Sequence, residues 1–298
     1  MRQTYGKLLP GMKLSDLAGK LLVVEGTDCA GRTTQINMLR PWLEELGHAV
    51  LDTGMTRSPL AGDGIRRAKE GNNLGRVTQS LFYATDFVDR LENEVIPALR
   101  AGFIVLTDRY IYSLMARAIV RGMDPAWIRG IYSTALIPDA VFYLRLDVEQ
   151  LIPRVIFSRG FDYWESGMDV FPGQDMFESF RSYQSSLLLE FDRLSTEFNF
   201  ETLDASADAK VVFAQLQAKV QRVLGGETRR DSFNASEASR REYLHKVFEY
   251  AAAATMRRNT DQPMAQPRES TGTDRSWGFH PVAASLSPQN GRGFFERK

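Results

Sequence analysis

The chain of 298 residues carries 37 basic and 37 acidic residues and a single cysteine, Cys29. This charge balance argues against a protein whose main task is binding nucleic acid or an anionic membrane surface, so any anion site has to be local. One cysteine excludes an internal disulfide framework and is typical of a reducing compartment, so we expect a cytoplasmic protein. Residues 1–19, an N-terminal extension, contain neither a signal-peptide core nor an anchor, and we expect no membrane span.

Short apolar runs alternate with helical patterns over residues 20–225, which form the main predicted domain. The predicted buried strands are residues 20–26, 49–54, 102–108, 139–147 and 199–206. The intervening segments, which include residues 33–47, 76–102 and 207–226, repeat apolar residues at three and four positions and end at glycine. This alternation predicts an α/β fold with a five-stranded parallel sheet and helices on both faces.

The composition changes after this domain. Residues 226–258 contain Ser239 and Glu242 at capping-box spacing, followed by apolar residues on one face, so we expect a helix in this C-terminal extension. Residues 259–298 are rich in Pro, Gly, Ser and Thr without periodicity, which predicts a disordered tail.

The segment VVEGTDCAGRTTQ, residues 23–35, follows a predicted strand and opens a predicted helix. Gly26, Gly31 and Thr33 fit the phosphate-loop pattern G-x-x-x-x-G-K-[ST] at every position but one, so the fold is expected to be of P-loop NTPase type. Backbone N–H groups of such a loop bind phosphate oxygens, and the Thr33 hydroxyl can bind Mg²⁺. The exception is Arg32, which keeps the positive charge of the usual lysine on a larger, planar group. The predicted ATP-binding residues are Gly26, Thr27, Asp28, Cys29, Ala30, Gly31, Arg32, Thr33 and Thr34.

A second polar cluster lies in VLTDRYIYS, residues 105–113. Asp108 and Arg109 follow a predicted strand, at the edge where ligands bind in open α/β sheets. An arginine at that edge suits a second anion.

In the order and spacing of these motifs the chain resembles the thymidylate kinase family. The family's motifs are matched by EGTDCAGRTT at 25–34, TRSP at 56–59, LFYATDFVDRLENEVIPAL at 81–99 and DRYIYS at 108–113. The resemblance covers residues 20–224. It implies a nucleoside-monophosphate kinase, with conversion of dTMP to dTDP as the leading activity, ATP and Mg²⁺ as cofactors, nucleotide substrates and a homodimer.

The resemblance also implies roles for individual residues. Asp28 would face the acceptor and, with Thr33, the metal ion, while Tyr83 would stack on the base. The residues that would bind the acceptor are Arg57, Tyr83, Phe87, Asp108, Arg109, Ser113 and Arg117. Residues 154–165 match a mobile lid, whose Asp162 and Glu165 stand at the acidic positions of the family's lid. The residues that would act in catalysis are Arg32, Asp28, Arg109, Arg154 and Arg159.

Four positions depart from the family pattern. Arg32 replaces lysine, Ser58 an acidic residue, Phe87 a base-reading arginine, and Arg117 an aromatic residue beside the sugar. Another pyrimidine nucleotide therefore stays open as acceptor. Tyr83 and Phe87 also fit a plain core stripe at i, i+4 spacing.

Two other functions are compatible with the sequence. A deoxynucleoside kinase would need a general base, for which Glu25 is the candidate. A catalytically weak nucleotide-binding regulator, acting through the C-terminal helix and tail, would account for Arg32 and the lost base reader.

Overall fold

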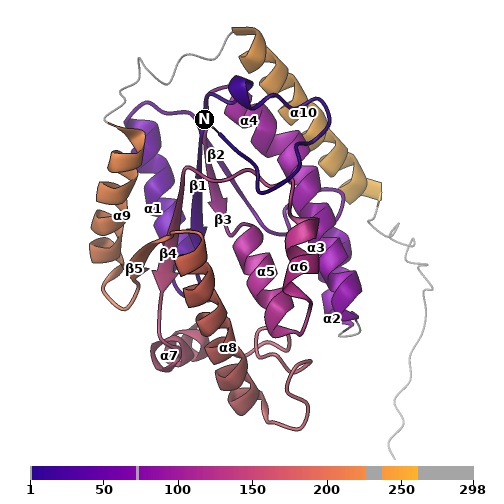
Figure 1. Cartoon of the computed structure of the whole chain (residues 1–298), viewed down its shortest axis with the longest axis vertical. Coiled ribbons are helices and arrows are strands. Elements are labelled where there is room, and N and C mark those ends of the chain that lie inside the picture. Colours follow the sequence, from indigo (N-terminus) through magenta and orange to yellow (C-terminus); the bar gives the residue numbers. More distant parts are fainter. Residues whose placement is uncertain (1, 72–73, 226–236, 261–298) are drawn as a thin grey trace, which may run out of the picture. The chain divides into compact units, whose positions relative to one another are not determined.

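The computed structural model describes residues 2–71, 74–225 and 237–260. All five predicted strands are present: β1 (Lys20–Glu25), β2 (Val50–Gly54), β3 (Ile104–Asp108), β4 (Ala140–Arg145) and β5 (Glu201–Asp204). They form one parallel sheet in the order β2-β3-β1-β4-β5 (Figure 1). The predicted α/β class and the five-stranded parallel sheet are confirmed.

The central strand, β1, runs through the middle of the core. Its residues 21–24 are completely buried, as expected for a parallel strand covered on both faces. In the sheet register, Val24 of β1 and Gly54 of β2 both pair with Asp108 of β3. The carboxyl ends of three strands therefore meet around Asp108, and the loops that follow them lie close together.

Helices cover both faces of the sheet (Figure 1). One face carries α1 (Arg32–Glu45) and α9 (Ala209–Leu224); the other carries α3 (Arg76–Arg90), α4 (Ile96–Arg100), α5 (Ile111–Val120) and α8 (Met176–Glu197). Other helical elements before residue 225 include η1 (Leu14–Asp16), α2 (Gly62–Glu70), α6 (Pro125–Ile131) and α7 (Val148–Ser158). Within the described ranges, no helix combines the length and the apolar character that a bilayer span requires.

A π-helical turn, η2 (Leu91–Val95), joins α3 to α4. The sequence predicted a single uninterrupted helix over this region. Glu94 of η2 accepts a 2.6 Å hydrogen bond from the Thr53 hydroxyl of β2, which ties the turn to the edge of the sheet. The turn therefore lies beside β2, at the point where α3 ends and α4 begins.

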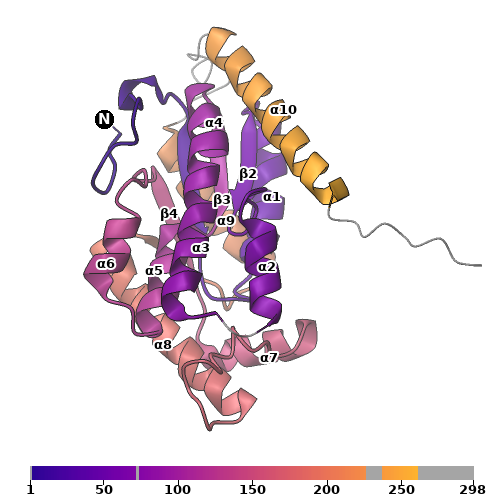
Figure 2. The same cartoon turned by 90° about the vertical axis from the view of Figure 1, so that its right-hand side faces the viewer.

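The C-terminal helix, α10 (Glu237–Thr260), packs on α4 and η2 (Figures 1 and 2). Tyr243 is buried in this contact, with its ring centroid 4.4 Å from that of Phe103. The helix begins two residues before the Ser239 cap that the sequence suggested. The predicted disordered tail lies outside the described residues, except for its first two positions, which end α10.

Candidate active site

The predicted phosphate loop, residues 26–31, connects β1 to α1. Gly26 and Gly31 have φ angles of 152° and 99°, and a Cβ on Gly26 would lie 2.8 Å from the Leu144 carbonyl oxygen. Only glycine fits such a position without strain. The loop borders a cavity of about 600 Å³, which we call the phosphate cavity. Its lining residues are Asp28, Cys29, Gly31, Arg32, Thr33, Thr34, Asp108, Arg109, Arg154, Ser158, Arg159 and Glu165.

Arg32, the residue in the lysine position, is folded back onto its own loop. Its Nη1 donates to the carbonyl oxygens of Gly26, at 2.6 Å, and of Thr27, while its Nε donates to Asp108 Oδ1 at 2.8 Å. Only 7% of the side chain is exposed. The planar guanidinium thus links the phosphate loop to the end of β3, a set of contacts for which a lysine ammonium has the wrong shape.

Asp28 lies at the centre of a group of arginines. Its two carboxylate oxygens accept hydrogen bonds from Arg109 and Arg117, and Arg159 and Arg32 approach within 3.8 and 3.9 Å. The side chain is 3% exposed, so these cations compensate a buried charge. Burial and the nearby Arg117 lower the pKa of Arg109 to about 9, which leaves it charged at neutral pH. The field around Asp28 is therefore positive and suits a further anion.

Several polar atoms here have unused hydrogen-bonding capacity. Among the described residues, Nε of Arg109, Nε of Arg117 and the hydroxyl of Thr27 are buried without a hydrogen-bond partner. Buried donors of this kind are rare in folded proteins, and each calls for a physical reason. A bound oxyanion would supply acceptors for the two arginine Nε atoms.

The backbone beyond β3 is bent so that Arg109 faces the phosphate loop. Arg109 has a φ of 68°, and its carbonyl accepts a 2.7 Å bond from the Thr107 hydroxyl. Glu25 braces the next turn, because its carboxylate accepts bonds from the N–H groups of Tyr110 and Ser113 and from the Ser113 hydroxyl. Both Glu25 and Ser113 are completely buried. Ser113, a predicted acceptor ligand, thus holds the turn instead, and Glu25 has no free oxygen to serve as a general base.

The ionisation of Glu25 gives a testable pH dependence. Burial raises the pKa of Glu25 above its ordinary value, although the bonds from Ser113 and Tyr110 oppose the rise. Protonation of Glu25 therefore favours the folded state, and this contribution is lost as the pH rises through the folded pKa. Because Gln stays neutral at every pH, we expect the unfolding free energy of wild type minus that of Glu25→Gln to be highest below about pH 4.5 and to fall toward neutral pH. Urea unfolding of both proteins over a pH series measures this value; a value of wild type minus variant that rises with pH contradicts the assignment.

The lid segment predicted at residues 154–165 spans the end of α7 and the turns after it. Arg159 pairs with Glu165 and faces the phosphate cavity. Arg154 donates a 2.8 Å bond to the Ala205 carbonyl, in the loop that leads into α9. The Asp162 carboxylate accepts two backbone N–H bonds of 3.0 Å and so shapes the turn instead of facing a ligand.

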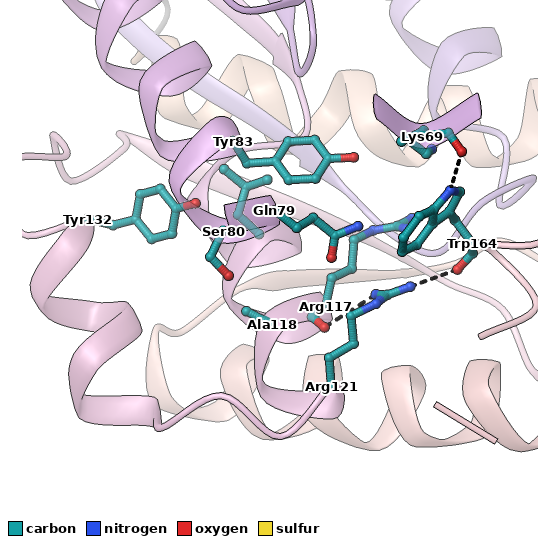
Figure 3. Close-up of a pocket in the computed structure, with 10 residues that line it drawn as sticks. Lys69, Gln79, Ser80, Tyr83, Arg117, Ala118, Arg121, Tyr132 and Trp164 are labelled. Atoms are coloured by element: carbon teal, nitrogen blue, oxygen red, sulfur yellow. Dashed lines mark hydrogen bonds between the residues drawn. The ribbon is translucent and has the colours of Figure 1, made fainter. Parts of the chain in front are cut away.

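A second cavity, which we call the acceptor cavity, lies between α3 and α5. Tyr83, Gln79, Arg117 and Trp164 point into it (Figure 3). Its free volume of about 20 Å³ is close to the space of one water molecule, so a nucleobase enters only if side chains move. Arg117 belongs to both sites, because it lines this cavity and bonds to Asp28 beside the other.

Three further residues of the acceptor cavity were not predicted from the sequence. Trp164 Nε1 donates to the Lys69 carbonyl at 2.9 Å, and Arg121 donates to the Trp164 carbonyl at 2.8 Å (Figure 3). Burial and the adjacent Arg117 lower the pKa of Lys69. No local sequence pattern predicts these residues, because they come from three separate segments that meet only in the folded chain.

Two predicted acceptor residues lie elsewhere. Phe87 is 2% exposed and packs edge-on against Tyr110 and Tyr132, so it belongs to the core and not to a base-reading position. Arg57 is not among the residues that line the phosphate cavity or the acceptor cavity, and its Nη1 lies 3.0 Å from Asp52 Oδ1. Its side chain is 44% exposed, which leaves this pair weak and easily exchanged.

The residues predicted to hold a metal ion fit Mg²⁺ only in part. The Thr33 hydroxyl lies in the phosphate cavity 3.3 Å from Asp108 Oδ2, an oxygen that Arg32 does not use. Asp28, by contrast, has both oxygens bound to arginine. No group of three or more His, Cys, Asp or Glu residues suited to a metal occurs in the described ranges. A metal ion here would rely on Thr33, Asp108 and oxygens of its nucleotide, as Mg²⁺ commonly does.

A phosphate loop and an adjoining cavity, joined by arginines that converge on one carboxylate, define the class of P-loop kinases that act on phosphorylated acceptors. The sequence profile described as thymidylate kinase matches residues 24–215. The chain thus belongs to the thymidylate kinase family, whose members are nucleoside-monophosphate kinases that use ATP.

Curated proteins agree with this membership. The chain is 35% identical to probable thymidylate kinase 2 of Saccharolobus solfataricus over 211 residues, which cover 70% of this chain and 97% of that protein. It is 29% identical to probable thymidylate kinase of Thermococcus kodakarensis over 216 residues, 69% of this chain and 99% of that protein. It is also 26% identical to thymidylate kinase of Brachyspira hyodysenteriae over 200 residues, 66% and 90% of the two chains.

Proposed function

We propose that this chain transfers the γ-phosphoryl group of ATP to the phosphate of dTMP and releases dTDP and ADP. The observation that carries the proposal is the position of Arg109 and Arg117. Both bond to Asp28 between the phosphate cavity and the acceptor cavity, and both keep a buried, unpartnered Nε. An acceptor phosphate at this point would take up those donors and stand next to the phosphate loop.

The reaction requires no proton abstraction. A phosphate oxygen of dTMP attacks the γ-phosphorus, and the bond from that phosphorus to the β-bridging oxygen breaks, so that ADP leaves. The protein contributes position and positive charge: Arg109 and Arg117 hold the acceptor phosphate, while Arg32 and Arg159 offset charge on the transferring group. Mg²⁺ bound at Thr33 and Asp108 would neutralise further charge on the nucleotide phosphates.

The proposal extends to the remaining residues, the location and the oligomeric state. Residues 26–34 would bind the ATP phosphates, and Tyr83 would stack on the thymine base after Arg117 has moved aside. Arg57 would reach the acceptor phosphate by exchanging Asp52 for it. A cytoplasmic location fits the single free Cys29. A homodimer, which the family resemblance implies, would sediment with twice the 33.7 kDa mass of the chain.

A substrate panel tests the proposal. We expect dTMP, with ATP and Mg²⁺, to give a higher kcat/KM than dCMP and the purine nucleoside monophosphates, because the acceptor cavity is lined by donors suited to carbonyl oxygens. Product is measured as the nucleoside diphosphate. Preferred use of dCMP or of a purine nucleotide would overturn the choice of dTMP.

A nucleotide-binding regulator is the second candidate. The regulator function is favoured by the contacts of Arg32, whose guanidinium donates its hydrogen bonds to carbonyl oxygens of the phosphate loop and to Asp108. Calorimetry with ATP and Mg²⁺, run beside the panel, separates the two functions. Binding of ATP without phosphorylation of any monophosphate would establish the regulator and exclude the kinase.

A further inference from the structure

Residues 55–61, which we call the acceptor-side loop, follow β2 at the carboxyl edge of the sheet and contain Arg57. Asp86 of α3 accepts 3.0 Å bonds from the N–H groups of Thr56 and Ser58. Thr56 has a φ of 60°, a conformation that non-glycine residues adopt only when their surroundings hold them in it. The loop therefore depends on carboxylates of α3 for its shape.

Asp89, about one turn further along α3, holds the same loop through Ser58. The Ser58 hydroxyl donates to Asp89 Oδ2 and accepts the N–H groups of Leu60 and Ala61, at 3.0 and 3.1 Å. Ser58 stands where the family pattern has an acidic residue. In this chain the Ser58 hydroxyl and the Asp89 carboxylate that it contacts stand in for that acidic side chain.

The C-terminal extension reaches the same carboxylate. Tyr250 of α10 donates a 2.8 Å hydrogen bond to Asp89 Oδ2, the oxygen that Ser58 also uses. Asn93 donates to the other oxygen, Oδ1, at 2.9 Å. Helix α10 lies beyond residues 24–215, the part of the chain that matches the family. Helix α10, which lies outside the family domain, thus contributes a hydrogen bond to Asp89 inside that domain.

The two carboxylates differ in how their charge is compensated. Asp86 forms a buried ion pair with Arg90, at 3.0 Å. The side chains that donate to Asp89 in the described part of the chain are neutral, namely those of Ser58, Asn93 and Tyr250. When only a few neutral donors hold a carboxylate, the loss of any one of them changes how firmly that carboxylate is positioned.

We propose that Tyr250 is a positioning residue: α10 fixes Asp89, Asp89 fixes the acceptor-side loop, and the loop sets where Arg57 can meet the acceptor phosphate. The register that pairs Gly54 with Asp108 places the start of this loop beside the site of Arg109. The proposal rests on the proposed kinase function. Its consequence is that the C-terminal extension tunes acceptor binding and leaves the transfer step largely unaffected.

Two matched substitutions on α10 test this role. Tyr250→Phe removes only the hydroxyl that bonds to Asp89. Tyr243→Phe makes the same chemical change on the same helix, at a hydroxyl that has no hydrogen-bond partner within the described residues. We expect Tyr250→Phe to raise KM for dTMP by about fivefold while kcat and KM for ATP stay within about twofold, and Tyr243→Phe to change none of the three. Equal changes in both variants, or a fall in kcat without a rise in KM for dTMP, would overturn the proposal.

Hydrogen exchange gives a reading that does not depend on kinase activity. In Tyr250→Phe we expect faster exchange at the amides of Ser58, Leu60 and Ala61, and unchanged exchange in β1. Unchanged exchange in the loop contradicts the link through Asp89, whether or not the chain is a kinase. Faster exchange combined with an unaltered Kd for dTMP, measured by calorimetry, contradicts the role in acceptor binding. If no nucleoside monophosphate is phosphorylated while loop exchange and dTMP binding change as expected, the kinase function fails and the positioning role stands.

Discussion

Arg32→Ala is expected to lower kcat by at least about 100-fold, on the scale of a lost charged or oxyanion contact in the transition state. The substitution removes a positive charge that contacts the phosphate loop directly and leaves Asp108 Oδ1 without its 2.8 Å partner. Because the side chain is buried, we also expect the free energy of unfolding to fall by about 3 kcal/mol. Steady-state kinetics with ATP and dTMP measure the first effect, and urea unfolding measures the second.

Two companion variants make this result interpretable. Arg40→Ala removes an exposed arginine of the same helix, paired with Glu44 at 2.9 Å, and should leave kcat and stability nearly unchanged. Arg32→Lys keeps the charge but loses the planar fork, so measurable activity should survive with reduced stability. The interpretation of Arg32 as a catalytic cation is wrong if Arg32→Ala turns over as fast as Arg32→Lys. If the natural chain is inactive and Arg32→Lys gains activity, the regulator function is correct.

Arg109→Ala is expected to lower kcat/KM for dTMP by about 100-fold while Kd for ATP changes by less than about threefold. Arg109 is one of the two arginines that bond directly to Asp28, and the missing guanidinium would leave the acceptor phosphate with Arg117 as its principal contact. Initial rates at varied dTMP and calorimetry with ATP give the two numbers.

The control for this variant is Arg129→Ala on α6, which breaks an exposed pair with Glu197 of α8 and should change neither number. A loss of affinity shared equally by ATP and dTMP would assign Arg109 to the phosphate loop as a whole. In that case the acceptor phosphate has to be placed elsewhere.

The fold was predictable because its signals are local. Each buried strand is a short apolar run, and each covering helix repeats its apolar residues every three or four positions, so sequence order alone indicates a parallel sheet. The phosphate loop was predictable for the same reason, because Gly26, Gly31 and Thr33 stand within eight residues of one another. The structure confirms the sheet and places the loop between β1 and α1.

The arrangement of side chains in the site was not predictable in this way. The bond from Arg117 to Asp28 joins residues 89 positions apart, and its existence depends on how α5 sits against the phosphate loop. Arg57 matches the family motif in sequence, yet its long side chain forms an ion pair with Asp52. Phe87 occupies the motif position of a polar residue but, as an apolar ring, packs in the core with Tyr110 and Tyr132.

The π-helical turn η2 has a consequence for how this chain tolerates insertions and deletions. A π turn contains one residue more than the α-helical turn it replaces, so one residue could be removed from Leu91–Val95 and the helix would still close its hydrogen bonds. Such a deletion would convert η2 into an ordinary α-helical turn and leave the orientation of the residues beyond it nearly unchanged. The buried face of α4, which includes Ala98 and Leu99, would therefore stay on the sheet, and Asp86 and Asp89 would keep their places. The same deletion within α3 or α4 has no extra residue to remove, so it would rotate the residues beyond it by about 100° and turn buried side chains away from the sheet.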